Sequence, residues 1–372
     1  MKISKIKPFL VDERRLFVRV YTDEGIVGNG GSGLWSQTKL GYEAIKELSR
    51  YYIGKDPTLI EHHWQVVTRH TTLHFMGAVL SSAVSAIDIA LWDIFGKSVN
   101  LPVYQLLGGK CRDKIRVFNV VRGDTFDELA ESASDSVKQG FTALRLTPFF
   151  KDPAKQTPTQ KVENAVKMIQ AIREAVGYDV DLGIEVHRRL SPGEAIVLGN
   201  ALEPYKLFFM EDPIAPARVD ALRYVASHVD IPIAEGERLY NIWQFKELID
   251  VGVSLIRTDI SLAGGFTHCK KIAAMAEASM VGILPHFSDP LKAAQIQLDA
   301  AIPNYVLHEP FFTTEMYSKI LDEPVKMERG YILLPERPGI GLEINEDALE
   351  NYPYKPWETK GAFHEDGSVA DL

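Results

Sequence analysis

Cysteine is scarce in this sequence, and long hydrophobic runs are absent. Two cysteines, Cys111 and Cys269, occur in 372 residues, and neither has the spacing of a metal ligand set. We therefore expect neither a disulfide framework nor a zinc site, and the reducing cytoplasm is the expected compartment. Charged residues interrupt the apolar stretch near the N-terminus, which is unlike a signal peptide. Because no run of about 18 apolar residues occurs, we expect no membrane-spanning segment and no membrane partner.

Positive charge is also in deficit. Asp and Glu number 50 against 41 Lys and Arg, which gives a formal net charge of −9. A nucleic-acid partner would need a clustered basic surface, so none is expected. An anionic small molecule is still compatible with this charge, because a bound divalent cation reverses the field around it. The length predicts one large and one smaller domain, and 46% hydrophobic residues are enough for a large core.

The first third of the chain has a β pattern followed by an α pattern. Residues 2–28 alternate like a β-hairpin, and residues 39–99 have helical periodicity, clearest at 78–94. The glycine-rich segment 28–38, GNGGSGLWSQT, contains a G-x-G-x-x-G pattern. A dinucleotide site would need this pattern inside a βαβ unit, which is absent here, so we interpret the segment as a flexible lid.

From residue 115 onward, short apolar runs alternate with helical patterns. The predicted strands lie at 115–121, 143–146, 180–186, 207–210, 231–234, 255–258, 281–284 and 305–307, and the predicted helices at 126–139, 161–176, 192–202, 219–228, 242–250, 267–278 and 291–301. This alternation predicts an α/β fold of the (β/α)8 type, a modified TIM barrel, although a doubly wound sheet would give a similar pattern. The tail beyond residue 310 returns to short strands and turns, and we expect it to pack back on the N-terminal region.

Three glutamates follow successive predicted strands of the barrel. Glu185, Glu211 and Glu237 lie at intervals of 26 residues, which matches one βα unit each. The carboxyl ends of barrel strands meet at one rim, so these side chains should converge there. Converging carboxylates repel one another unless a cation lies between them, and all-oxygen ligands select Mg²⁺ over zinc or copper. Acidic residues after strands can also simply cap the next helix, but three in register favour a magnesium site.

Two histidines are expected at the same rim. His187 lies two residues beyond Glu185, so both side chains of an extended strand point to the same side. His286 follows the seventh predicted strand, and Asp259 ends the sixth, where it could orient His286 and raise its basicity. Glu309 follows the eighth strand. We interpret these residues as candidate acid–base groups.

Several motifs resemble the enolase superfamily, in its mandelate racemase-like branch. They are SAIDIALWDIFGKSVNLPVYQLLGG at 85–109, then EVHRRLSP, FFMEDPI, IAEGERLY and TDISLAGGFTH in that order, and the resemblance covers nearly the whole chain. Within this branch the chain is most similar to sugar-acid dehydratases of the galactonate and mannonate type, including HEDGS at 364–368. The resemblance implies an α+β capping domain from residues 1–114 and 313–372, around a barrel formed by residues 115–312.

The resemblance also implies functions for individual residues. It implies that three ligands bind Mg²⁺, namely Glu185, Glu211 and Glu237. It also implies that four further residues take part in catalysis, namely His187, Asp259, His286 and Glu309. Of these, Glu309 would contact the oxyanion or hydroxyl region of the substrate. Two positions depart from the pattern. The first ligand is usually Asp, and here Glu185 adds a methylene group. The second predicted strand has no lysine, which disfavours a racemase. The presence of Asp259, together with the absence of a tyrosine at 148–160, favours the galactonate type over the mannonate type.

These residues suggest a dehydration. We expect His286, oriented by Asp259, to remove the C2 proton of an aldonate and His187 to protonate the leaving C3 hydroxyl, which yields a 2-keto-3-deoxy acid. The substrate-binding candidates are Trp35, His74 and Arg238. A cycloisomerase acting on a sugar-acid lactone or anhydro acid, and a non-catalytic regulator, are the alternatives. The expected partner is a small sugar acid, and the expected assembly is a homo-oligomer.

Overall fold

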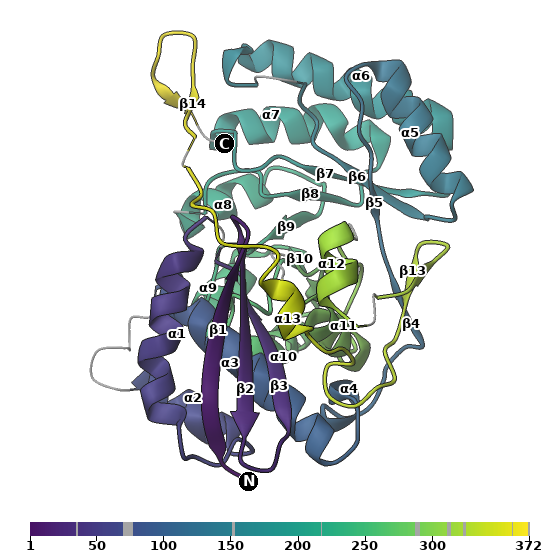
Figure 1. Cartoon of the computed structure of the whole chain (residues 1–372). Coiled ribbons are helices and arrows are strands. Elements are labelled where there is room, and N and C mark those ends of the chain that lie inside the picture. The colour runs from purple at the N-terminus through teal and green to yellow at the C-terminus, as the bar shows by residue number, and fades with distance from the viewer. Residues whose placement is uncertain are drawn as a thin grey trace.

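The N-terminal part of the computed structural model joins a small sheet to a layer of helices (Figure 1). The structure describes residues 1–34, 36–69, 77–150, 153–216, 218–286, 291–310, 314–322, 325–358 and 360–370. The sheet is antiparallel, and its order is β1-β2-β3. It consists of β1 (Ile3–Val11), β2 (Arg15–Thr22) and β3 (Val27–Ser32). The helices are α1 (Thr38–Tyr52), α2 (Ile60–Arg69), α3 (Ala78–Ser98) and the short α4 (Val103–Leu106).

Strand β3 corrects the prediction of a flexible lid over residues 28–38. Residues 28–32 pair with β2 and lie against α3. A Cβ atom on Gly28 would lie 2.1 Å from the carbonyl oxygen of Ala90, and one on Gly30 would lie 1.9 Å from that of Ala86. The glycines therefore allow a strand to approach a helix backbone closely. The predicted hairpin is in fact the first two strands of a three-stranded sheet.

Helix α3 is long and apolar enough to cross a membrane by length and composition. In this fold, however, it lies mostly buried between the N-terminal sheet and α10 (Gly265–Ala278). Two buried carboxylates tie it to its surroundings. Asp88 accepts a hydrogen bond from the backbone N–H of Thr267, and Asp93 accepts one from that of Ile340 at 2.8 Å. These polar contacts are typical of a core helix.

The barrel is built from parallel strands. Its sheet has the order β11-β10-β9-β8-β7-β6-β5. The strands are β5 (Asn119–Val120), β6 (Ala143–Leu146), β7 (Asp181–Glu185), β8 (Phe209–Glu211), β9 (Ile233–Glu235), β10 (Leu255–Ile256) and β11 (Gly282–Ile283). Parallel bridges from Tyr305 to Ile283 and from His308 to Val117 join the two edges. This closure confirms the barrel and rules out a doubly wound sheet, whose edges stay open.

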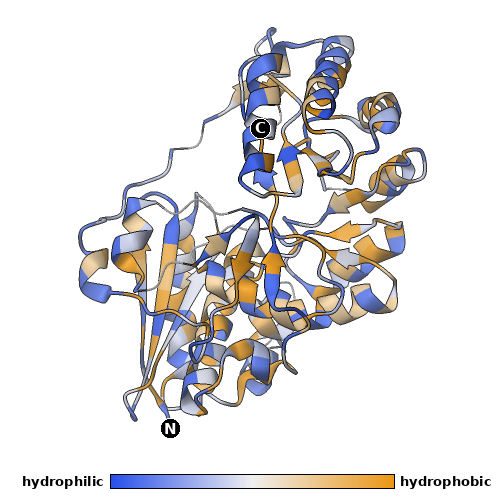
Figure 2. Ribbon diagram, turned by 90° about the vertical axis from the view of Figure 1, so that its right-hand side faces the viewer, coloured by the Kyte–Doolittle hydropathy of each residue, from blue (hydrophilic) through white to orange (hydrophobic). Residues whose placement is uncertain are grey.

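Helices alternate with the strands on the outside of the barrel. They are α5 (Phe126–Lys138), α6 (Pro158–Val176), α7 (Pro192–Leu202), α8 (Val219–Ala226), α9 (Ile242–Val251), α10 and α11 (Lys292–Ala301). Ser191 and Glu194 form a capping box at the start of α7, which explains why its sequence-based boundaries match the structure. In Figure 2 these helices carry both blue and orange residues, as expected for helices with one face against the strands.

The C-terminal segment returns to the N-terminal part of the chain. It contains α12 (Glu315–Ile320), β12 (Met327–Glu328), β13 (Tyr331–Leu333), α13 (Glu346–Leu349), β14 (Ala362–Phe363) and β15 (Val369–Ala370). Strand β13 pairs with β4 (Lys114–Arg116), and Glu346 of α13 forms ion pairs with Lys7 and Arg19 of the first sheet. The division into domains at residues 114 and 312 stays a prediction, in agreement with these contacts.

Candidate active site

The alternation of side chains along the barrel strands produces two layers inside the barrel. The lower layer is an apolar cluster that includes Ala143, Phe209, Leu255, Leu284 and Leu307. Side chains two residues further along a strand point to the same side, one layer nearer the carboxyl end. The residues at these positions are all polar: Arg145, Glu211, Arg257, His286 and Glu309. A charged layer therefore lies directly above the apolar one.

The three predicted metal ligands converge in this charged layer. One carboxylate oxygen each from Glu185, Glu211 and Glu237 lies within 4.8 Å of the others, and all three side chains are buried. Strands β7 and β8 end at Glu185 and Glu211, which are paired in register, and Glu237 follows β9 by two residues. The predicted convergence of these residues is thus present in the structure.

Two buried arginines contact these carboxylates, and the sequence interpretation did not single them out. Arg145 Nη2 lies 2.8 Å from Glu185 Oε2, and its Nη1 lies 2.9 Å from Glu211 Oε2. Arg257 Nη2 lies 2.7 Å from Glu309 Oε2. Burial lowers the pKa of Arg145, but the opposite effect of Glu211, Glu309 and Glu185 is larger. The net pKa is raised, so the guanidinium stays charged. Each arginine lies two residues beyond an apolar barrel residue, which is the signal that could have identified it.

The buried glutamates of the site differ in their pKa values. Burial raises the pKa of Glu211 to about 7, although Arg257 and Arg145 act against it. Burial also opposes ionisation of Glu237, but His286 and Arg188 hold its pKa well below the usual range. Likewise, the pKa of Glu309 is lowered to about 2 against its burial, because Arg145 and Arg257 lie beside it. Glu237 and Glu309 are therefore firmly ionised, while Glu211 would gain from a further cation.

The chemistry of the three glutamates suits Mg²⁺. Oε1 of Glu211 is buried and accepts no hydrogen bond within the described part of the chain, although it forms an ion pair with Arg257, whose Nη2 lies 2.5 Å away. Its lone pairs are thus available to a cation. Hard oxygen donors without a thiol match the preference of Mg²⁺, and a dication would offset the repulsion among the three carboxylates.

His286 is held by the partner predicted for it. Its Nδ1 lies 2.8 Å from Asp259 Oδ2, and its Nε2 lies 3.4 Å from Glu237 Oε2. Burial lowers the pKa of His286, but Glu237 and Asp259 outweigh it and raise the pKa to about 9. Because Glu237 is the largest raising cause, any neutralisation of Glu237 lowers this pKa toward the range of a general base.

His187 lies across the barrel from His286. It follows β7, which is four strands from β11 in the closed ring, so the two rings face the site from opposite walls. Its Nε2 lies 2.7 Å from Glu185 Oε1, and its backbone is left-handed, with φ of 55°. The structure therefore brings together every predicted catalytic residue and metal ligand, while their functions stay predictions.

A pocket of about 570 Å³ opens above these residues. Its lining includes most of the charged layer and four residues from outside the barrel, Arg14, Gly33, Ser36 and Trp357. Arg238 also lines it, with its Nε 3.2 Å from Glu237 Oε1. Trp35 and His74, the other predicted substrate contacts, lie outside the described residues. Arg14 and Trp357 come from distant ends of the chain, and no local sequence signal points to them.

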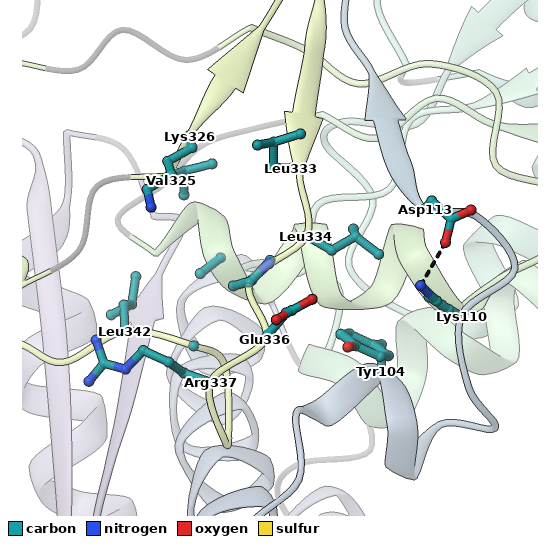
Figure 3. A pocket seen from close by; sticks show the side chains of 13 residues that line it. Tyr104, Lys110, Asp113, Val325, Lys326, Leu333, Leu334, Glu336, Arg337 and Leu342 are labelled. Atoms are coloured by element: carbon teal, nitrogen blue, oxygen red, sulfur yellow. Dashed lines mark hydrogen bonds and ion pairs between the residues drawn. The ribbon is translucent and has the colours of Figure 1, made fainter.

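A second cavity, of about 550 Å³, lies elsewhere (Figure 3). Residues of α4, α11 and the segment around β13 line it, including Tyr104, Ala293 and Leu333. Its one drawn ion pair, between Lys110 and Asp113, is exposed to solvent. The cavity shares no lining residue with the pocket at the barrel mouth. The predicted catalytic residues line the mouth pocket and not this cavity, so the mouth pocket is the candidate active site.

Comparison with known proteins agrees with this geometry. Residues 10–108 match the family model of the mandelate racemase/muconate lactonizing enzyme N-terminal domain, and residues 128–348 match that of the enolase C-terminal domain-like family. The D-galactonate dehydratases of Pectobacterium atrosepticum and Cronobacter sakazakii are 37% and 36% identical, each over 100% of both chains. An enolase from Agrobacterium radiobacter, solved with bound Na and L-malate, superposes with a TM-score of 0.92 at 30% identity and covers 100% of both chains.

Proposed function

Because the chain belongs to the mandelate racemase/muconate lactonizing enzyme family, within the enolase superfamily, we propose that it dehydrates a sugar acid in a magnesium-dependent reaction. The full-length likeness to several D-galactonate dehydratases makes the chain a sugar-acid dehydratase, a hydro-lyase. The magnesium ion, the residue functions and the reaction steps below are our proposal. The observation that carries it is the Asp259–His286 pair beside the three converging glutamates.

The proposed substrate lies with its carboxylate at the charged layer. Glu185, Glu211 and Glu237 would hold Mg²⁺, which supplies positive charge opposite the negative charge that develops on the substrate carboxylate. Glu309, fixed between Arg145 and Arg257, limits where that carboxylate can lie. A cation held by Glu237 would offset the charge that raises the pKa of His286, so that His286 could act as a base at neutral pH.

Two histidines transfer different protons in the proposed reaction. His286 Nε2 removes the C2 proton, and Asp259 stabilises the imidazolium that results. His187 on the opposite wall donates a proton to the C3 hydroxyl, so the C3–O bond breaks and water leaves. The remaining enol takes up a proton at C3 and loses the proton of its C2 hydroxyl, which gives a 2-keto-3-deoxy acid. Each proton transfer to a positioned side chain typically contributes about 10²–10⁴ in rate.

The experiment is a product assay with Mg²⁺-loaded protein and a panel of C5 and C6 sugar acids. We expect at least one acid to yield a semicarbazide-reactive 2-keto-3-deoxy product. His286→Asn should abolish the product while calorimetry still detects binding of metal and acid. Full activity in His286→Asn would refute the assignment of the base.

The same assay separates the alternatives. Turnover of lactones or anhydro acids without a 2-keto-3-deoxy product would favour a cycloisomerase, and binding without any turnover would favour a regulator. The proposed partner is a small sugar acid. A homo-oligomer in the cytoplasm stays a prediction, which size-exclusion chromatography and fractionation would test.

A further inference from the structure

Three polar side chains are buried in the layer between the barrel strands and the surrounding helices. This layer is built mainly from apolar residues, and the outward-facing Leu144 and Met210 belong to its core. Gln295 and Asp299 of α11 and His308, which precedes the last catalytic candidate of the barrel, are each 0% exposed. Polar groups in such a place are costly unless they form hydrogen bonds, so their partners indicate their function.

The three side chains contact one another in sequence. Leu307 and Glu309 belong to the two layers inside the barrel, so the side chain of His308 between them points outward, toward α11. Its Nδ1 lies 2.7 Å from Asp299 Oδ2. Gln295, one helical turn before Asp299, donates a hydrogen bond from Nε2 to Asp299 Oδ1 at 2.7 Å. Asp299 therefore orients the amide of Gln295.

The other end of this amide holds the peptide that follows Asp259. Gln295 Oε1 accepts a hydrogen bond from the backbone N–H of Ile260 at 3.3 Å. The carbonyl oxygen of the same peptide belongs to Asp259, and it accepts hydrogen bonds from the N–H groups of Leu262 and Ala263 at 3.1 and 2.7 Å. Both polar groups of the peptide are thus fixed, and they set the direction in which the Asp259 side chain leaves the backbone.

We propose that Gln295 is a positioning residue for the base: held by Asp299, it fixes the backbone at Asp259 and thereby the orientation of His286. The inference rests on the proposed function, which makes His286 the base. Gln295 is buried behind the barrel wall, so it acts through Asp259 and does not touch the substrate. Rotation of the peptide would displace Asp259 Oδ2 from His286 Nδ1, 2.8 Å away, and a misplacement of about 1 Å can cost about 10² in rate.

Gln297 provides a matched control on the same helix. It is also 0% exposed, its Oε1 accepts a hydrogen bond from the backbone N–H of Tyr104 at 2.8 Å, and its Nε2 donates one to the carbonyl oxygen of Ile340 at 3.3 Å. Replacement of either glutamine by methionine leaves one buried backbone N–H without its acceptor. The two variants should therefore lose similar stability, although only Gln295 contacts the peptide beside Asp259.

The kinetic test uses the Mg²⁺-loaded protein and a sugar acid that it dehydrates. Gln295→Met should lower kcat by about ten- to a hundred-fold and leave KM nearly unchanged, because the base is misoriented while the binding groups stay in place. Gln297→Met should keep both constants. Gln295→Asn is a milder second variant, since its shorter amide cannot contact both Asp299 and the Ile260 N–H, and it should lower kcat as well. Unchanged kcat in a folded Gln295 variant, or equal losses at positions 295 and 297, would overturn the inference.

A spectroscopic measurement tests the same inference without turnover. The Nδ1 proton of His286 should give a downfield NMR signal, because it lies in a short contact with a carboxylate, and His286→Asn identifies the signal by its loss. This signal should move upfield in Gln295→Met, where the contact lengthens, and stay in place in Gln297→Met. An unmoved signal in Gln295→Met would overturn the inference. If no sugar acid is dehydrated by the unaltered protein, the proposed function fails, and the NMR signal still decides whether Gln295 positions His286.

Discussion

Nδ1 of His286 lies 2.8 Å from Oδ2 of Asp259, and this contact directs Nε2 of the ring toward the pocket. Asp259 is itself fixed, because its Oδ1 accepts hydrogen bonds from the backbone N–H and the hydroxyl of Ser261 at 2.9 and 2.5 Å. The carboxylate thus selects one tautomer and one orientation of the imidazole. Asp259 acts through His286, as a positioning residue.

Asp259→Asn should lower kcat by about 10² or more, because the ring loses its orientation and its stabilised imidazolium. The variant should also move the acid limb of the pH–rate profile to lower pH. Asp259 raises the pKa of His286, so its removal lowers that pKa, and the base is then deprotonated at lower pH. Steady-state kinetics between pH 5 and 9 would measure both effects. Asp250→Asn, in an exposed pair with Lys246, is the control, and an unmoved acid limb in Asp259→Asn would contradict this positioning function.

Magnesium should stabilise the fold through the glutamate cluster. Binding to the native state alone raises the free energy of unfolding by about 2.7 kcal/mol when the ion is present at a hundred times its dissociation constant. We expect Mg²⁺ to raise Tm by several degrees and EDTA to reverse the shift. Glu211→Gln should remove most of the effect, since this residue has the buried oxygen without a hydrogen bond. Glu163→Gln, on the exposed face of α6, should keep it; equal shifts in the two variants would place the ion elsewhere.

Much of the barrel was predictable because its strands and helices follow simple periodicities. The boundaries of α7 were predicted correctly, since Ser191, Pro192 and Glu194 define its start by local chemistry. Strand β3 was not predicted, because VGNGGS has low strand propensity. Its pairing with β2 and the close approach of Gly30 to α3 are tertiary effects, which override that propensity.

The site was predictable where residues recur at the interval of one βα unit, because such residues lie at the ends of neighbouring barrel strands. Glu185, Glu211 and Glu237 follow that rule. The contacts of Arg145 with these carboxylates were not predicted, since they depend on which face of β6 points inward. Trp357 could not be placed at all, because it reaches the mouth only through the packing of the C-terminal segment.

Gly30→Ala should destabilise the protein by about 3 kcal/mol or more. The added Cβ would lie 1.9 Å from the carbonyl oxygen of Ala86, so β3 and α3 would have to separate. Overpacking of this kind typically costs about 1–3 kcal/mol, and contact with backbone leaves little room for relaxation. Gly193→Ala is the matched control, because a methyl group added there, in the first turn of α7, would have no described atom within 4 Å. Urea unfolding would compare them, and equal midpoints would show that the sheet and helix can move apart freely.

Asp88 of α3 is buried and accepts a hydrogen bond from Thr267 of α10. Burial raises the pKa of this carboxyl to about 7 from 3.8, although the hydroxyl and backbone N–H of Thr267 lower it. The folded state therefore binds more protons than the unfolded state between about pH 4 and 7, and this group's contribution to stability falls as pH rises through that window. Asp88→Asn cannot ionise, and its amide can still bond to Thr267. Relative to this variant, the unaltered protein should lose a few kcal/mol between pH 4 and 8, since each pKa unit corresponds to about 1.4 kcal/mol. Urea unfolding at several pH values measures the difference, with Asp135→Asn on exposed α5 as the control. A difference that stays constant with pH would mean that Asp88 is ionised in the fold throughout.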